Sequence, residues 1–258
     1  MIPKNPRPPI RLAIAVPTYN EAKNITKLVS QIKSSVKKAN VPCTLLIIDD
    51  NSPDGTGALA DKLVTSQTSG DFVVEVLHRK GKEGLGKAYV AGLQKLLKQN
   101  YTHIMQMDAD FSHDPKYIQD FVSQAREGKD FVAASRYMKG GGIVGWELHR
   151  RILSLGGNIY ARLLLGNTIT DYTNGLNMFS TELLRKVRLD SLRAAGYGFF
   201  IELKYTALQY AKDFVQIPII LVDRQRGQSK LPKNTIFISL ILVPRLRFSV
   251  KKKTRANK

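Results

Sequence analysis

The sequence has few of the residues that would place it in several large classes of protein. Its one cysteine, Cys43, has no partner for an internal disulfide, so a reducing compartment is the simplest interpretation. No cluster of Cys and His suggests a zinc site. The longest largely apolar run, 236–243, is well short of the roughly 20 residues that cross a bilayer, so we expect no transmembrane helix. Residues 1–9 lack an apolar core, so we expect neither a signal peptide nor a transit helix there.

Acidic residues are also scarce, at 21 against 40 basic ones. The resulting net charge of +19 favours an anionic partner, which leaves nucleic acid, phosphorylated small molecules and an anionic membrane open. The length of 258 residues and the 43% hydrophobic content are typical of one large globular domain, or of a domain with an appendage.

Apolar runs of strand length alternate with helical patterns, which predicts an α/β fold with a mostly parallel sheet flanked by helices. The expected strands are Ile10–Val16, Thr44–Ile48, Phe72–Leu77, His103–Met107, Phe131–Ser135 and Phe214–Val222. The expected helices are Glu21–Ala39, with Asn20 as its N-cap, Thr56–Gln67, Lys87–Gln99, Pro115–Glu127 and His149–Leu165.

Two carboxylates, Asp108 and Asp110, follow the strand that we expect to end at Met107. Successive side chains of an extended chain point to opposite faces, so these two would share a side and could reach one hard divalent cation. A solvated turn before a helix start at Pro115 explains the same residues without any metal. Polar clusters also follow two other strands, at 18–21 and 49–52. Because ligands of open α/β sheets bind beyond the carboxyl ends of the strands, this coincidence favours a binding site over isolated turns.

Residues 149–165 form an amphipathic pattern after a glycine-rich segment at 140–142. Its apolar members, at helical spacing, are Ile152, Leu153, Leu155, Ile159, Leu163 and Leu164. Two interpretations stay open, a helix that packs its apolar face on the core and a helix that lies on a membrane surface. The stretch 235–248 and the basic residues after it could also contact anionic lipid.

Several strings together resemble an inverting GT-A (Rossmann-like) glycosyltransferase, namely residues 16–21 (VPTYNE), 48–56 (IDDNSPDGT) and 107–110 (MDAD). Residues 84–89, 135–137 and 222–231 narrow the resemblance to the dolichyl-phosphate mannose synthases, also called polyprenol monophosphomannose synthases. The likeness spans roughly residues 10–231. It implies transfer of mannose from GDP-mannose to a dolichyl or other polyprenyl phosphate, with inversion to a β-mannosyl phosphate.

The resemblance also implies an organisation and a location. Residues 1–9 would be an extension, 10–231 the catalytic domain with an acceptor- and membrane-proximal segment at about 140–170, and 232–258 an apolar stretch with a basic tail. The protein would bind peripherally to the cytosolic face of a membrane, the endoplasmic reticulum in a eukaryote or the plasma membrane in a prokaryote. A small membrane-anchoring subunit is a further possible partner, and no nucleic acid is expected.

Roles for individual residues follow from the same resemblance. The nucleotide-sugar site would comprise Pro17, Tyr19, Glu21, Ile48, Asp50, Asp108, Ala109, Asp110, Arg136, Arg224 and Lys230. The metal, Mg²⁺ or Mn²⁺ because all its ligands are oxygens, would be held by Asp110 with Asp108 and Ser112. The acceptor phosphate would contact Arg150, Ser154 and Ser229, with ordinary helix-surface placement as the alternative for the first two. The expected catalytic residues are Asp110, Arg136 and Arg224.

Four other positions carry weaker indications. Relatives often read Asp-Pro-Thr-Ser-Gly where this chain has Asp171 to Gly175, and the departures at Tyr172 and Asn174 leave the role of Asp171 open. His113 is more often an incidental residue than a substrate contact. Lys87, after two glycines, is better explained by helix packing than by phosphate binding, and Glu202 would support the acceptor site.

Three alternatives to mannosyl transfer remain on sequence grounds. A polyprenyl-phosphate glucosyltransferase that uses UDP-glucose would share the acidic motif. A basic nucleic-acid-binding protein would explain the net charge, although the chain has no recognisable DNA- or RNA-binding motif and acids stand at its strand ends. A regulatory subunit that kept the fold without activity is opposed by the intact Asp108, Asp110, Arg136 and Arg224.

Overall fold

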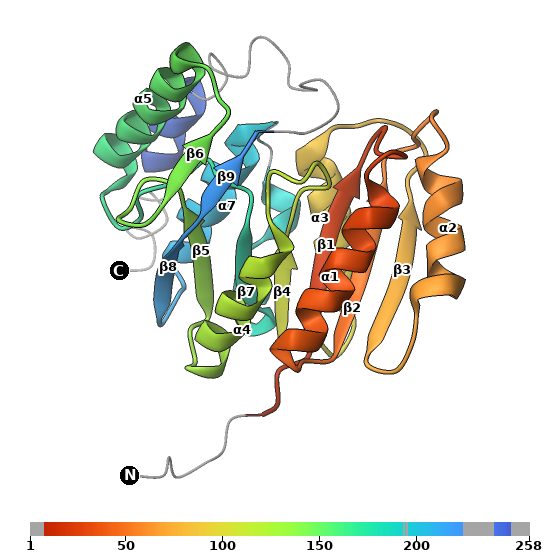
Figure 1. The fold of residues 1–258 in the computed structure, drawn as a ribbon. Helices are drawn as coiled ribbons and strands as arrows, with labels where there is room; N and C mark the ends of the chain where they lie inside the picture. Colours follow the sequence, from red (N-terminus) through yellow and green to blue (C-terminus); the bar gives the residue numbers. More distant parts are fainter. Residues whose placement is uncertain (1–7, 193, 195, 224–239, 249–258) are drawn as a thin grey trace.

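A seven-stranded sheet forms the centre of the molecule, in the order β3-β2-β1-β4-β7-β5-β8 (Figure 1). The computed structural model describes residues 8–192, 194, 196–223 and 240–248. The strands are β1 (Leu12–Thr18), β2 (Cys43–Asp49), β3 (Phe72–His78), β4 (His103–Gln106), β5 (Phe131–Ser135), β7 (Asn177–Ser180) and β8 (Phe214–Pro218). All neighbouring pairs are parallel except those of β7, which runs antiparallel to both β4 and β5. A small parallel sheet joins β6 (Gly142–Val144) to β9 (Ile220–Val222).

Helices cover both faces of this sheet (Figure 1). One face carries α1 (Ile25–Ala39), α2 (Thr56–Gln67) and α4 (Ile118–Arg126), and the other carries α3 (Leu85–Leu97), α6 (Thr181–Lys186) and α7 (Tyr197–Leu208). Short 3₁₀ turns cover Pro115–Tyr117 and Leu189–Ser191. Strand β1 alternates between the two cores, and both sets of side chains are buried. A strand covered on both faces needs apolar residues at every position, which explains why β1 is a continuous apolar run.

The alternation of strands and helices confirms the predicted α/β class, with corrections to individual elements. The helix expected from Glu21 begins at Ile25, because Asn20 has a left-handed φ of 57° and the chain turns before the helix. The predicted N-cap at Asn20 is therefore wrong. Helix α3 begins at Leu85, and a Cβ on Gly86 would lie 2.9 Å from the carbonyl oxygen of Ala194, which supports the helix-packing interpretation of that glycine-rich start.

The strand predicted over Phe214–Val222 is two strands in two different sheets. Strand β8 pairs with β5 in the central sheet. The chain then leaves this sheet at Ile219, and β9 pairs with β6 in the small sheet. The sequence of the run at 214–222 does not show where one strand ends and the next begins, because the pairing with β5 and with β6 sets that boundary. The antiparallel β7 and helix α7 were not among the sequence predictions.

Helix α5 (Leu148–Leu165) lies over the carboxyl end of the sheet, beside a helical segment at 240–248 (Figure 1). A third apolar cluster joins these two to α7, with Ala161 and Leu165 from α5, Tyr205 from α7 and Val243 from 240–248. The Tyr160 hydroxyl donates to the carbonyl of Leu240 at 2.9 Å. Within the described residues, no helix combines the length and apolarity that crossing a membrane requires.

Candidate active site

A pocket opens between the carboxyl ends of β4 and β5 and the start of α5. Its walls come from four parts of the chain: the turn after β4, the end of β5 with the first turns of α5, the loop before β7, and β9 with the residue after it. The lining residues are Asp108, Ser112, His113, Arg136, Trp146, Arg150, Thr173, Asn174, Gly175, Leu221 and Asp223. Two carboxylates, Asp108 and Asp223, therefore share the pocket with two arginines, Arg136 and Arg150.

The acidic side of the pocket is a turn rather than a strand end. Strand β4 stops at Gln106, and Phe111 has a φ of 63°, so the predicted extended backbone through Asp108 and Asp110 is wrong. Burial raises the pKa of Tyr89, and the charges of Asp108 and then of Asp110 raise it further. The Tyr89 hydroxyl donates to Oδ1 of Asp108 at 3.0 Å. Tyr89 was not a sequence prediction.

Asp110 is held by the third predicted metal ligand. The hydroxyl of Ser112 donates to Oδ1 of Asp110 at 2.6 Å, and the Ser112 backbone N–H donates to the same oxygen at 3.1 Å. No group of three or more His, Cys, Asp or Glu that could hold a metal occurs among the described residues. Two carboxylates with a hydroxyl fit Mg²⁺ or Mn²⁺, because such ions take one or two carboxylates and complete their shell with substrate phosphates and water.

His113 is part of this turn, so the prediction that it is incidental is wrong. Its ring is 2% exposed, and its Nδ1 accepts a hydrogen bond from the backbone N–H of Asp108 at 3.0 Å. The imidazole thus fixes the backbone from which the Asp108 carboxylate projects. Its burial inside the pocket wall depends on the tertiary structure, and a lone histidine in the sequence gives no sign of it.

The basic wall is built on a buried ion pair between Arg136 and Asp171. Nε and Nη2 of Arg136 donate to the two carboxylate oxygens at 2.7 and 2.9 Å, and its backbone N–H donates to Oδ2 at 3.1 Å. The side chains are 4% and 0% exposed. Burial alone would raise the pKa of Asp171, but Arg136 and then Lys204 outweigh it and lower that pKa to about 2. Asp171 therefore orients Arg136, which answers the question that the sequence left open.

Lys204 lies beneath this pair and was missed by the sequence analysis. It is fully buried, and its Nζ donates to the carbonyl oxygen of Asp171 at 2.8 Å. Burial lowers its pKa to about 7, Asp171 opposes that shift and Arg136 adds to it. One sequence feature could have revealed it. Lys204 falls on the spacing of Phe200, Leu203 and Ala207, which all pack in one core, and a lysine on an apolar stripe needs a buried partner.

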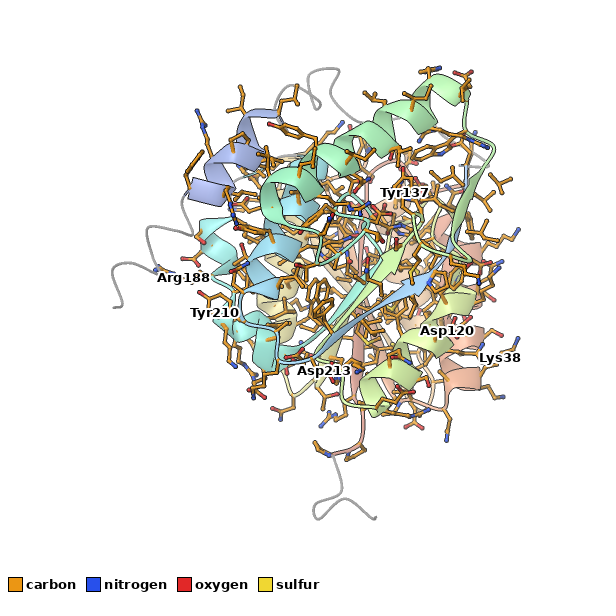
Figure 2. The ribbon with its side chains drawn as sticks, turned by 90° about the vertical axis from the view of Figure 1, so that its left-hand side faces the viewer. Lys38, Asp120, Tyr137, Arg188, Tyr210 and Asp213 are labelled. Atoms are coloured by element: carbon orange, nitrogen blue, oxygen red, sulfur yellow. The ribbon has the colours of Figure 1, made fainter. Side chains whose placement is uncertain are left out.

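Helix α5 contributes the other cation. Nη1 of Arg150 donates to Oδ1 of Asp223 at 2.9 Å, and the guanidinium carbon lies 3.9 Å from the ring centroid of Trp146. The hydroxyl of Ser154 accepts a hydrogen bond from Tyr137 at 2.7 Å, and Figure 2 shows Tyr137 beneath α5. Arg150 therefore lines the pocket, so the helix-surface alternative is wrong for it. Trp146, which the sequence analysis did not single out, lines the pocket as well.

Of the residues predicted to bind the nucleotide sugar, Asp108 and Arg136 line this pocket. Four others, Pro17, Tyr19, Glu21 and Asp50, lie along the neighbouring strand ends, outside it. The Lys82 ammonium lies 4.1 Å from the ring centroid of Tyr19. Asp50 forms an ion pair with Arg79 and accepts a hydrogen bond from the Gly84 N–H at 3.2 Å. Oε2 of Glu21 accepts from the Asn24 amide at 2.7 Å, and Pro17 is half-buried.

Two of those nucleotide-site predictions need correction. The side chain of Ile48 is 0% exposed and packs in the core on the α3 side, where a Cβ on Gly92 would meet it. That of Ala109 is 4% exposed and belongs to the opposite core. Neither side chain lines the pocket, because the alternation of strand residues and the turn after β4 direct both into the cores.

The remaining sequence predictions fall elsewhere. Arg224, Ser229 and Lys230 lie outside the described residues. Oε2 of Glu202 accepts the N–H of Ala194 at 3.0 Å, so it holds the segment before α7 and does not line the pocket. Lys87 is exposed and forms an ion pair with Glu83.

The outer face of α5 is an exposed apolar row. Leu148, Ile152 and Leu163 are 72%, 62% and 78% exposed, and Leu155 and Ile159 lie between them on the same helical face. The residues that α5 buries are Asn158, Ala161 and Leu165, on the opposite face. The interpretation in which this apolar row packs on the core is therefore wrong, although Leu164 does contact the third apolar cluster.

Comparison with known proteins agrees with this architecture. The model of the family described as "Glycosyl transferase family 2" matches residues 13–188. The chain is 34% identical over 236 residues to an undecaprenyl-phosphate mannosyltransferase of Micrococcus luteus, covering 92% of this chain and 93% of that protein. It is 36% identical over 234 residues to a polyprenol monophosphomannose synthase of Mycolicibacterium smegmatis, covering 91% and 86%.

Solved structures share the fold at lower identity. Mannosyl-3-phosphoglycerate synthase from Rubrobacter xylanophilus superposes with a TM-score of 0.66 at 20% identity, covering 92% of this chain and 73% of that one. Glucosyl-3-phosphoglycerate synthase from Mycobacterium tuberculosis, solved with Mn²⁺ and UDP, gives 0.62 at 19% identity, covering 91% and 77%. The central sheet with helices on both faces is thus a GT-A fold.

Proposed function

The chain belongs to glycosyl transferase family 2, and on that premise we propose that it transfers mannose from GDP-mannose to a polyprenyl phosphate, with inversion at the anomeric carbon. The two curated relatives support the mannosyl group and the polyprenyl phosphate through their names. The donor nucleotide and the inversion are inferences from the strings shared with the mannose synthases and from the chemistry of the site.

The observation that carries this proposal is that α5 has a charged residue in the pocket and an apolar surface on its outer side. The helix places Arg150 in the pocket and exposes an apolar row on its outer face. An acceptor with a phosphate head and a long apolar tail needs both, because the phosphate must reach the sugar while the tail stays in lipid. A soluble acceptor would give no reason to expose so much apolar surface beside the pocket.

The reaction exchanges one bond to phosphate for another. An oxygen of the acceptor phosphate attacks C1 of mannose, the bond from C1 to the diphosphate breaks, and GDP leaves with the electron pair. The acceptor phosphate is largely ionised at neutral pH, since the second pKa of a phosphate lies near 6, so no general base is required. Attack on the face opposite the leaving group inverts the anomeric centre and yields a β-mannosyl phosphate.

Each wall of the pocket has a task in this reaction. Asp108, Asp110 and Ser112 would hold Mg²⁺ or Mn²⁺. When bound, the metal supplies positive charge that stabilises the leaving diphosphate. Arg136, kept in position by Asp171, presents a fixed cation to phosphate oxygens at no cost of reorganisation. Arg150 and Ser154 place a cation and a hydroxyl where the acceptor phosphate would enter from the lipid side.

We place the protein peripherally on the cytosolic face of a membrane, the endoplasmic reticulum in a eukaryote or the plasma membrane in a prokaryote. The helix at 240–248, which packs beside α5, also exposes Leu240, Ile241 and Phe248. The net charge of +19 adds attraction to anionic lipid. An amphipathic helix binds a membrane surface by burying its apolar face at the boundary between lipid headgroups and acyl chains, and the apolar row of α5 could do the same.

Transfer is tested by incubating the purified protein and a detergent-solubilised polyprenyl phosphate with radiolabelled GDP-mannose or UDP-glucose, with Mg²⁺, Mn²⁺ or EDTA. Label extracted into organic solvent measures the product. We expect metal-dependent labelling from GDP-mannose, lost in Asp110→Ala. Labelling from UDP-glucose instead would support the glucosyltransferase alternative, and absence of labelling from both donors would contradict the proposal.

Membrane binding is tested by sedimentation with phosphatidylglycerol-containing vesicles. The triple variant Leu148→Gln, Ile152→Gln, Leu163→Gln removes the apolar row, and Val73→Gln on the distant edge strand β3 is the matched control. We expect the triple variant to lose most of its vesicle binding and to keep its affinity for GDP-mannose. Vesicle binding equal to that of the control would assign attachment to other segments or to an anchoring subunit.

A further inference from the structure

Two hydrogen-bond donors in the pocket wall have no partner among the described residues. One is Nε1 of Trp146, and the other is Nδ2 of Asn174. Trp146 is 9% and Asn174 2% exposed, and both line the pocket. A buried donor without an acceptor destabilises the folded protein, so such groups are usually satisfied by a ligand or by water.

The orientation of the Asn174 amide is fixed by the backbone. Its Oδ1 accepts the N–H of Leu176 at 2.7 Å, so the atom left without a partner is the NH₂ group. The backbone N–H of Asn174 donates to Oδ1 of Asp171 at 3.1 Å, and its backbone carbonyl accepts from the Asn177 amide at 3.1 Å. Turning the side chain away would therefore break several hydrogen bonds of this loop. An indole N–H can only donate. Both unsatisfied groups therefore call for an acceptor atom.

The surrounding charges indicate what kind of acceptor would fit. The ring of Trp146 lies against two guanidinium groups, with the carbon of Arg150 at 3.9 Å and that of Arg136 at 5.5 Å from its centroid. Asp171 pairs with Arg136 and Asp223 pairs with Arg150, and a divalent metal at Asp108 would add positive charge to the pocket. Donors beside cations match an anionic oxygen, and a phosphate offers several such oxygens.

We propose that Trp146 and Asn174 bind the substrate directly, each donating a hydrogen bond to a phosphate oxygen. Trp146 also holds Arg150 by stacking, so the indole both binds and positions. The phosphate could belong to the sugar-nucleotide diphosphate or to the acceptor monoester, and the experiment separates the two. The inference rests on the mannosyl transfer proposed above.

The first experiment needs no catalysis. Trp146 is the only tryptophan in the sequence, so the intrinsic emission of the whole protein reports on this pocket. The wild-type protein is titrated with GDP plus Mn²⁺, and separately with farnesyl phosphate in detergent. We expect an emission change with at least one ligand. In Asn174→Asp, an isosteric change that replaces the donor by a carboxylate oxygen, the midpoint for that ligand should move at least about tenfold higher.

The second experiment separates the two phosphates. KM for GDP-mannose and KM for the polyprenyl phosphate are measured for Trp146→Phe, which keeps an aromatic face against Arg150 but has no N–H, and for Asn174→Asp. Tyr210→Phe is the control, an exposed residue that Figure 2 shows well away from Tyr137 and α5. We expect one KM to rise at least about tenfold in each variant, the other to change less than about threefold, and the control to match wild type.

These outcomes distinguish the inference from the function beneath it. A wild-type protein that binds both ligands but transfers no mannose would refute mannosyl transfer and leave the phosphate contacts standing. Wild-type KM values in both variants, together with an unshifted emission titration in Asn174→Asp, would overturn the contacts and leave the transfer standing. If Asn174→Asp fails to fold by circular dichroism, Trp146→Phe alone decides, because it leaves the hydrogen bonds of the loop at Asn174 intact.

Discussion

Replacing Asp171 by Asn tests whether the basic wall depends on one buried carboxylate. The side chain is 0% exposed and accepts three hydrogen bonds from Arg136, two from its guanidinium and one from its backbone. It also accepts the backbone N–H groups of Thr173 and Asn174. An amide at this position would leave the guanidinium without a counter-charge and would turn N–H groups toward its donors.

The expected cost is large because both partners are buried. Removal of one member of a buried ion pair typically costs about 3–5 kcal/mol, a large part of the roughly 5–15 kcal/mol by which a domain is stable. For a chain of this size that corresponds to a fall in Tm of about 6–20 °C. Urea unfolding followed by the emission of Trp146 measures the loss. The control is Asp213→Asn, which breaks an exposed pair with Lys129 and should cost at most about 1 kcal/mol.

The pH dependence gives a second and sharper check. The pKa of Asp171 is lowered to about 2 from a usual 3.8, so its stabilisation is present above about pH 4 and is lost as pH falls toward 2. The difference in unfolding free energy between wild type and Asp171→Asn should shrink by about 2 kcal/mol as the pH falls from 5 toward 2. At pH 5, where the Asp171 carboxylate is ionised, a loss no larger than that of Asp213→Asn would refute the ion-pair reasoning.

Three further predictions concern groups near the pocket. Asp110→Ala should abolish metal-dependent mannosyl transfer while its thermal melt stays within a few degrees of wild type, which a radiolabel assay and calorimetry measure together. Tyr89→Phe removes the hydrogen bond to Asp108 but keeps the aromatic stack, so Mn²⁺ affinity in the presence of GDP, read by electron paramagnetic resonance, should fall about tenfold; unchanged affinity would contradict this role. Lys204 has a pKa of about 7 in the folded protein and 10.5 unfolded, so the unfolded state binds more protons between these values and stability should rise by about 2 kcal/mol from pH 7 to 8.5. Urea midpoints should show this rise in wild type and its absence in Lys204→Met.

Local patterns gave much of the fold. The apolar runs of β1 and β2 predict buried parallel strands because both faces are covered, and the spacing of Ile25, Leu28, Val29 and Ile32 predicts the buried face of α1. The parallel order also predicts that polar residues after several strands meet at one edge, and Asp108 does line the pocket there.

Other features depend on partners that are distant in the chain. The pairing of Arg136 with Asp171 spans 35 residues, and that of Arg150 with Asp223 spans 73. No local pattern marks such pairs. The division of the run at 214–222 into β8 and β9 likewise depends on β5 and β6, which pair with its two halves.

The sequence by itself determined the α/β class, the pair of carboxylates after β4 and the presence of an amphipathic helix, because each depends on residues close together in the chain. The tertiary structure alone decided which face of that helix is free. Asn158, Ala161 and Leu165 take the contacts with the rest of the molecule, so the apolar row from Leu148 to Leu163 faces outward. The tertiary structure also decided that Trp146 and Asn174 line one pocket and that Lys204 lies beneath it, hydrogen-bonded to Asp171. Burial and hydrogen-bond partners are properties of the folded chain.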